Sequence, residues 1–248
     1  MPSAPIPAAT LVVFRDRPDG PPELLMVERA KAMVFAGGAM VFPGGRIDPG
    51  DHDLAATIDA GDDGAARIAA IRETIEEAGL AIGLDPVPSP TALATIRARL
   101  HAGESFATIL AAAGIALDLE ALVPFARWLP DHETTRIFDT VFFLARAPDA
   151  AAASVDATEN VRLIWTTAAA LLAEADAGRA TVIYPTRRNL ERLALFADHA
   201  AAVAQARAHP VRTITPFTTL RDGVPHLCIP EGLGYPVTGE AFAQARRG

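Results

Sequence analysis

The stretch RETIEEAGL at residues 72–80 decides how this chain is interpreted. Glu73, Glu76 and Glu77 stand at positions i, i+3 and i+4, which share one face of an α-helix. Three carboxylates on one face repel one another, by roughly 0.2–0.5 kcal/mol for each like-charged pair, and a hard divalent cation relieves that repulsion. The pattern predicts a site for Mg²⁺ or Mn²⁺, although the spacing alone also fits a solvated acidic helix face.

A magnesium site of this kind has a chemical use. Magnesium keeps several water ligands and binds phosphate oxygens, so it polarises a phosphoryl group and lowers the pKa of a bound water. Arg72 directly precedes the acidic cluster and is suited to orient a glutamate through a bidentate pair. Arg72, Glu73, Glu76 and Glu77 are therefore the candidate catalytic residues.

A second informative stretch, VFPGG at residues 41–45, precedes this helix. It reads as a strand that runs into a glycine pair and then into an acidic turn. Gly44 and Gly45 have no side chain, so the backbone there can approach a phosphate closely. We take both glycines as candidate substrate-binding residues.

Together the two stretches resemble the Nudix box, the loop–helix–loop signature of the Nudix hydrolases. Gly45 takes the place of the first glycine of the box, and Gly79 and Leu80 close it. Asp51 stands where the family has its first glutamate. Twenty residues, 52 to 71, separate Asp51 from the arginine, where the usual box has seven.

A Nudix box split in this way resembles that of the coenzyme A diphosphatases of animal peroxisomes and mitochondria, which have many bacterial relatives. Residues 24–29 resemble the strand before their box, and residues 136–143 resemble their Arg-Phe-Asp-Thr strand. Residues 38–45 fit part of the motif associated with coenzyme A recognition, although Val34 stands where an arginine is expected. The helix after residues 184–186 is similar to their C-terminal region.

The resemblance implies hydrolysis of coenzyme A or an acyl-coenzyme A to 3′,5′-ADP and (acyl) 4′-phosphopantetheine, with the three helix glutamates holding one to three cations. The general base is one of these glutamates or a distant carboxylate, for which Glu133 and Glu159 are candidates; each also fits a surface loop. Arg29 and Arg136 are candidates for binding substrate phosphates, because the guanidinium fork is planar and always charged.

Two other functions remain open. The same box serves Nudix pyrophosphatases of ADP-ribose or of dinucleotides, because it acts on the diphosphate and not on the groups at either end. A non-catalytic, ligand-sensing Nudix domain is the third alternative. Its expected mark is the loss of a box glutamate, and all three helix glutamates are present here.

The composition limits the partners of the chain. Its 248 residues carry a net charge of −8, so it is a poor candidate for binding nucleic acid, and a phosphate-bearing small-molecule nucleotide substrate needs a cation. The single cysteine, Cys228, excludes an internal disulfide and a Cys-based zinc site. Residues 1–9 do not read as a signal peptide, and no apolar run is long enough for a bilayer. We expect a cytoplasmic protein with no membrane partner, and a homodimer stays open.

The remaining pattern predicts a mixed sheet packed between helices. Residues 9–14 and 23–27 read as a hairpin, residues 65–78 as a helix capped by Gly79, and residues 189–208 as one long helix. The expected fold is of the α/β (α+β) class, a Nudix-type α/β/α sandwich with added helices. We expect a single domain over residues 1–248, with a helical insert around 85–118, broken at Gly103, and a C-terminal helical extension around 185–248.

Overall fold

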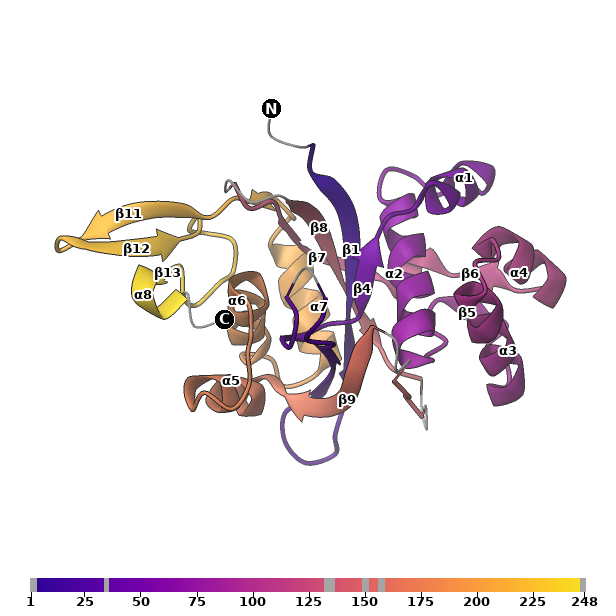
Figure 1. Ribbon diagram of the computed structural model, residues 1–248, viewed down its shortest axis with the longest axis horizontal. Coiled ribbons are helices and arrows are strands. Elements are labelled where there is room, and N and C mark those ends of the chain that lie inside the picture. The colour runs from indigo at the N-terminus through magenta and orange to yellow at the C-terminus, as the bar shows by residue number, and fades with distance from the viewer. Residues whose placement is uncertain (1–3, 34–35, 132–136, 149–151, 156–158, 246–248) are drawn as a thin grey trace.

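The computed structural model describes residues 4–33, 36–131, 137–148, 152–155 and 159–245 (Figure 1). Its centre is a mixed eight-stranded sheet with helices on both faces. The order β10-β7-β8-β1-β2-β3 runs across the sheet, while β4 also pairs with β1 and β9 with β2. The strands are β1 (Ile6–Arg15), β2 (Glu23–Arg29), β3 (Met40–Val41), β4 (Gly44–Arg46), β7 (Val123–Trp128), β8 (Phe138–Arg146), β9 (Asn160–Thr167) and β10 (Thr213–Ile214).

Strand β1 lies in the middle of the sheet and is buried on both faces. It pairs antiparallel with β2 and β4 and parallel with β8. Successive side chains of a strand point to opposite faces, and β1 follows this rule. Leu11 and Val13 belong to one hydrophobic core, and Val12 and Phe14 to the other. This division produces the α/β/α sandwich predicted from the sequence.

The first core lies under α2 (Gly64–Ala78), with α3 (Pro90–His101) and α4 (Phe106–Ala113) beyond it (Figure 1). Ile68, Ile71 and Ile75 of α2 are fully buried in this core. Gly79 adopts the left-handed conformation, with φ 63°, at the end of α2. The predicted helix and its glycine cap are both confirmed.

The second core lies under α5 (Ala168–Asp176), α6 (Tyr184–Leu193) and α7 (His199–Ala208) on the other face of the sheet. The prediction of one helix over residues 189–208 is wrong, because the chain breaks between α6 and α7. Asp198 explains the break: its side chain accepts a hydrogen bond of 2.7 Å from the Ala201 amide and so begins a new helix as an N-cap.

The insert around 85–118 contains α3 and α4, with Gly103 between them at φ 78°, and a short ribbon of β5 (Leu84–Asp85) and β6 (Ala116–Leu117). A 3₁₀ turn, Leu119–Ala121, leads from it to β7.

The C-terminal part is not wholly helical, in contrast to the prediction. After α7 the chain forms a three-stranded antiparallel sheet and a short helix (Figure 1). Asp222 and Gly223, with φ 51° and 77°, form the turn between its first two strands, an Asp-Gly hairpin within residues 213–235, which the sequence pattern indicated to be irregular or strand-like. We call residues 213–245 the C-terminal segment; it contains β10, β11 (Phe217–Arg221), β12 (Val224–Cys228), β13 (Gly239–Ala241) and α8 (Phe242–Ala245).

The acidic insertion inside the box folds into α1 (Pro49–Thr57), followed by a turn that leads into α2. The insertion therefore lengthens the connection without moving α2 away from the sheet. Over the described ranges, no helix has both the length and the apolar character needed to cross a lipid bilayer.

Candidate active site

The three candidate glutamates lie near the C-terminal end of α2, and hydrogen bonds from α3 fix the position of this end. Arg97 of α3 donates hydrogen bonds to the carbonyl oxygens of Glu76 and Glu77, at 2.8 and 3.1 Å. The same guanidinium donates to the Ser154 carbonyl oxygen at 3.0 Å. The last carbonyls of a helix have no partner inside the helix, so a cation there both satisfies and stabilises them.

The two glycines of β4 allow the strand to lie directly against the glutamates. The Gly44 amide donates a hydrogen bond of 2.9 Å to Oε2 of Glu77. A Cβ atom built on Gly45 would collide with the carboxylate of Glu73. The glycine pair and the acidic helix therefore lie in direct contact.

Arg72 is the centre of the carboxylate cluster. It donates two hydrogen bonds to Asp51, from Nε at 3.1 Å and from Nη2 at 2.9 Å. Its Nη1 donates to Glu73 at 2.8 Å and to Glu76 at 3.0 Å. Burial lowers the pKa of Arg72, but the hydrogen bonds to Asp51 and the neighbouring carboxylates outweigh burial and raise it.

Asp51 occupies a defined place in the cluster despite the insertion. It is only 2% exposed, and its carboxylate also accepts a hydrogen bond of 2.9 Å from the Asp48 amide at the start of α1. The fold of the insertion therefore brings Asp51 back to Arg72, from which 20 intervening residues separate it in the sequence.

Burial dominates the electrostatics of the glutamates. It raises the pKa of Glu73 to about 8, against the lowering effect of Arg72 and with a further raising effect from Glu77 and Glu76. Burial likewise raises the pKa of Glu76, although Arg72 counteracts it. Burial therefore favours the protonated form of Glu73 when no cation is bound.

Glu77 is held differently from the other two glutamates. Besides the Gly44 amide, it accepts a hydrogen bond of 2.9 Å from Nδ2 of Asn160, a fully buried residue at the start of β9. Asn160 was not singled out from the sequence. Its position directly after Glu159 offered no spacing signal, because only the pairing of β9 with β2 brings it to α2.

Arg29, at the end of β2, lies beside Glu77, with 4.0 Å between Nη1 and Oε1. Its Nη2 lies 3.8 Å from Oε2 of Glu159. Within the described chain its buried Nε has no hydrogen-bond partner. Of the other predicted polar residues, Glu133 and Arg136 lie outside the described residues.

These side chains line a cavity of about 610 Å³. Its polar and glycine lining consists of Gly44, Gly45, Arg29, Arg72, Glu73, Glu76 and Glu159, among others. Its apolar lining includes Phe42, Trp128, Phe138, Phe142, Ile183 and Pro185. No sequence pattern marked Trp128, because only the packing of β7 against α6 brings it to the cavity.

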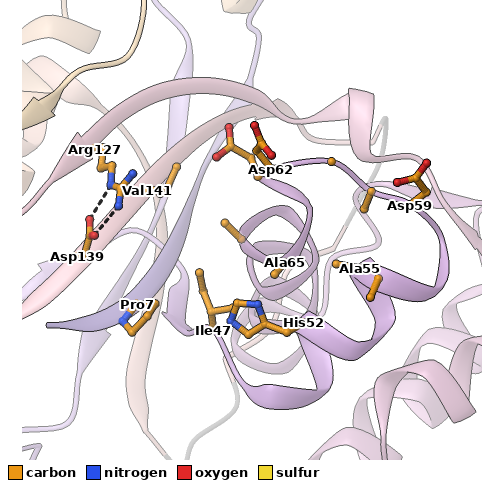
Figure 2. A pocket seen from close by; sticks show the side chains of 15 residues that line it. Pro7, Ile47, His52, Ala55, Asp59, Asp62, Ala65, Arg127, Asp139 and Val141 are labelled. Atoms are coloured by element: carbon orange, nitrogen blue, oxygen red, sulfur yellow. Dashed lines mark hydrogen bonds and ion pairs between the residues drawn. The ribbon is translucent and has the colours of Figure 1, made fainter. Parts of the chain in front are cut away.

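A second cavity, of about 470 Å³, lies on the opposite face of the same strands (Figure 2). Asp139 and Val141 of β8 line it, whereas Thr140 and Phe142 line the first cavity, as strand alternation requires. Figure 2 shows Arg127 paired with Asp139, with hydrogen bonds of 2.8 and 2.6 Å, across from His52 and other residues of the insertion. Because none of the α2 glutamates lines this second cavity, we assign the candidate active site to the first.

The donor set of the first cavity suits a hard cation, since it consists of carboxylate oxygens. In the described hydrogen bonds, Arg72 uses one oxygen each of Glu73 and Glu76, which leaves Oε2 of Glu73 and Oε1 of Glu76 for other ligands. Among the described side chains, no three acidic, histidine or cysteine groups already converge on one point suited to a metal. In this arrangement the guanidinium group of Arg72 supplies positive charge to Glu73 and Glu76, as a bound cation would.

The fold and the box together define a Nudix hydrolase. The family described as the NUDT19 Nudix domain matches residues 53–193, which is 141 of the 248 residues. The chain belongs to this family of Nudix hydrolases. The matched region includes the acidic helix and ends at the last residue of α6, so Gly44, Gly45 and the C-terminal segment lie outside it.

One solved structure supports the fold, and two more distant ones are also similar to parts of this chain. A Nudix hydrolase from Alicyclobacillus acidocaldarius is 30% identical, with a TM-score of 0.72, over 82% of this chain and 96% of that one. A MutT protein from Methanosarcina mazei Go1 is 15% identical, with a TM-score of 0.43, over 76% and 91% of the two chains. The Nudix domain of Shewanella oneidensis NrtR, complexed with ADP ribose, is 13% identical, with a TM-score of 0.42, over 76% and 86%.

Proposed function

We propose that this Nudix hydrolase cleaves the diphosphate of coenzyme A or of an acyl-coenzyme A. The products are 3′,5′-ADP and 4′-phosphopantetheine or its acyl form. The observation that carries the proposal is the contact between Asp51 and Arg72 across the insertion. It supports reading residues 45–80 as a split but complete Nudix box, the feature that resembles the coenzyme A diphosphatases.

The lining of the cavity suits such a substrate. Its polar lining includes Arg29 and the α2 carboxylates, which suit a diphosphate together with its cation, while its apolar lining can take a group attached to the diphosphate. A volume of about 610 Å³ is within the usual range of sites for small molecules.

The cation in this proposal is Mg²⁺ or Mn²⁺, held by Glu73, Glu76 and Glu77. When bound, it polarises the diphosphate and lowers the pKa of a coordinated water. Arg72 keeps Glu73 and Glu76 side by side, and Gly44 and Asn160 fix the carboxylate of Glu77.

The remaining roles follow from position. Arg29 reaches the cavity with its Nε unpaired in the described chain, which suits a phosphate oxygen. In the reaction a water oxygen forms a bond to one phosphorus, the bridging P–O bond breaks, and a carboxylate takes the proton of the water. Glu73, Glu76 and Glu159 line the cavity and are the candidates for that base.

A substrate panel tests the proposal. The protein is incubated with Mg²⁺ and coenzyme A, acetyl-coenzyme A, ADP-ribose or NADH, and the products are separated by chromatography. We expect 3′,5′-ADP from the first two, and none when a chelator removes the metal. Product from ADP-ribose alone would replace the coenzyme A assignment, and no product from any compound would contradict the enzymatic proposal.

A further inference from the structure

The apolar wall of the active-site cavity is built partly by the start of α6. Ile183, Pro185 and Thr186 line the cavity there, and Trp128 of β7 lies beside them. The rings of Trp128 and Tyr184 meet edge to face, with their centroids 6.2 Å apart. None of these residues contributes a carboxylate, so they can act on whatever is attached to the diphosphate.

Two residues of the C-terminal segment contact the residues around this wall. Tyr235 contacts Trp128, and Glu240 contacts Arg188 of α6. We propose that Tyr235 and Glu240 position Trp128 and the first turn of α6, and thereby determine which group the enzyme accepts beyond the diphosphate. The inference rests on the proposed function for the identity of the substrate, and it adds a part of the chain that lies outside the matched family region. In this role both are positioning residues, since neither lines the cavity.

Tyr235 acts on Trp128 directly. Its ring is 8% exposed and meets the Trp128 ring edge to face at 6.0 Å. The hydroxyl donates a hydrogen bond of 2.6 Å to Oδ1 of Asn189 on α6, and it accepts one of 3.3 Å from Nε1 of Trp128. One hydroxyl therefore fixes both β7 and α6 at the wall.

Glu240 of β13 acts through Arg188. The Arg188 side chain is 1% exposed, and its Nη2 lies 3.2 Å from Oε2 of Glu240. Its Nε and Nη1 are buried without a hydrogen-bond partner in the described chain. A buried arginine with so few partners depends strongly on the carboxylates that remain, here those of Glu240 and Glu191.

Arg188 in turn contacts the residue that begins α6. Its guanidinium carbon lies 5.1 Å from the centre of the Tyr184 ring, within the range of a cation–π contact. The Tyr184 hydroxyl donates a hydrogen bond of 3.0 Å to the Leu227 carbonyl oxygen of β12. Figure 1 shows the C-terminal sheet and α8 next to α6. The sheet thus contacts two side chains of α6: the Leu227 carbonyl oxygen accepts a hydrogen bond from Tyr184, and Glu240 pairs with the buried Arg188.

The test uses two variants, Tyr235→Phe and Glu240→Gln, each of nearly unchanged shape. Loss of one hydrogen bond or charge contact of about 0.5–1.5 kcal/mol corresponds to a roughly 2- to 12-fold change. We expect the KM for coenzyme A to rise by this factor while kcat stays within about twofold. Glu231→Gln, at an exposed glutamate of the same segment, is the matched control and should change neither constant.

A spectroscopic measurement separates this inference from the proposed function. Trp165→Phe leaves Trp128 as the single tryptophan, so its emission reports on the wall without any substrate. In that background, Tyr235→Phe and Glu240→Gln should shift the emission maximum and raise quenching by acrylamide, and Glu231→Gln should not.

The outcomes are distinct. If coenzyme A is not cleaved, the proposed function fails, and the KM comparison is made with whichever compound of the panel is cleaved. If neither variant changes the Trp128 emission, or if kcat falls while KM stays constant, the positioning role is overturned. Circular dichroism and thermal unfolding of all variants establish that each is folded.

Discussion

Arg72 holds together a cluster of carboxylates in the candidate active site. A single guanidinium contacts Asp51, Glu73 and Glu76, and it also donates to the Arg46 carbonyl oxygen at 3.0 Å. In the proposed mechanism the arginine of the box therefore organises the metal-binding carboxylates. The contribution of each neighbour can be tested by single substitutions.

Gly45→Ala tests the contact between the strand and the helix. The new Cβ would overlap the Glu73 carboxylate, so that carboxylate must move away from β4. We expect the Mg²⁺ concentration for half-maximal rate to rise at least about tenfold, as for other substitutions next to a ligand. Gly50→Ala is the control, because nothing lies within 4 Å of its Cβ. Equal metal dependence in both variants would contradict the proposed role of Gly45.

Asp51→Asn tests the residue that replaces the first glutamate of the box. The amide keeps the shape but loses the charge opposite Arg72, and hydrogen bonds between charged groups contribute about 1.5–3 kcal/mol. The free energy of unfolding in urea should fall by roughly that amount. Asp53→Asn, at an exposed position of the same helix, should leave it within about 0.5 kcal/mol. Unchanged stability of Asp51→Asn would show that the pair is not structural.

Helix α2 buries the carboxyl group of Glu73, and this makes the stability of the folded protein depend on pH. The pKa of Glu73 is about 8 in the folded chain against an ordinary value of 4.5, so the folded state binds the extra proton between these values. The stability of the metal-free protein therefore falls as pH rises from about 4.5 to 8. Cations bind the carboxylate, so the increase in Tm caused by Mg²⁺ should be larger at pH 8.5 than at pH 6.5.

Glu73→Gln provides the comparison for this measurement. The variant has no carboxyl group to titrate at this position, so both the pH trend and the effect of Mg²⁺ on Tm should be smaller than in the wild type. An equal effect of Mg²⁺ at the two pH values in the wild type would argue against cation binding to a buried, titrating carboxylate.

The elements differ in how well the sequence predicted them. α2 was predicted with its cap because helix composition, the acidic face and Gly79 all indicate the same boundaries. α6 and α7 were merged because the apolar spacing continues across the break, while the Asp198 cap depends on one short side chain. In β11 and β12 the apolar residues are largely exposed, so no core pattern marked those strands.

In the whole molecule, the two faces of the central sheet support different helices. The core on one face supports α2, and the core on the other supports α6, α7 and the C-terminal segment. The candidate active-site cavity draws residues from both parts, with polar residues from α2 and glycines from β4, and apolar residues from α6 and β7.

The sequence indicated candidates for the polar lining of this cavity and none for its apolar lining. Arg72, the three glutamates and the glycine pair lie in two short stretches, and their order resembles the Nudix box, whereas the helical spacing alone also fits a solvated face. Asn160 and Trp128 come from strands far along the chain, and only the pairing of β9 with β2 and the packing of β7 against α6 bring them to the site. No pattern in one sequence contains that information.

The most direct measurement is the Mg²⁺-dependent cleavage of coenzyme A by the wild type and by Glu76→Gln. The wild type should release 3′,5′-ADP, and the variant should be at least about a hundredfold slower, as expected for loss of a key electrostatic group. Glu174→Gln, an exposed glutamate on α5, should cleave at the wild-type rate. A folded Glu76→Gln variant with near-normal activity would contradict the assignment of the α2 glutamates as the metal site.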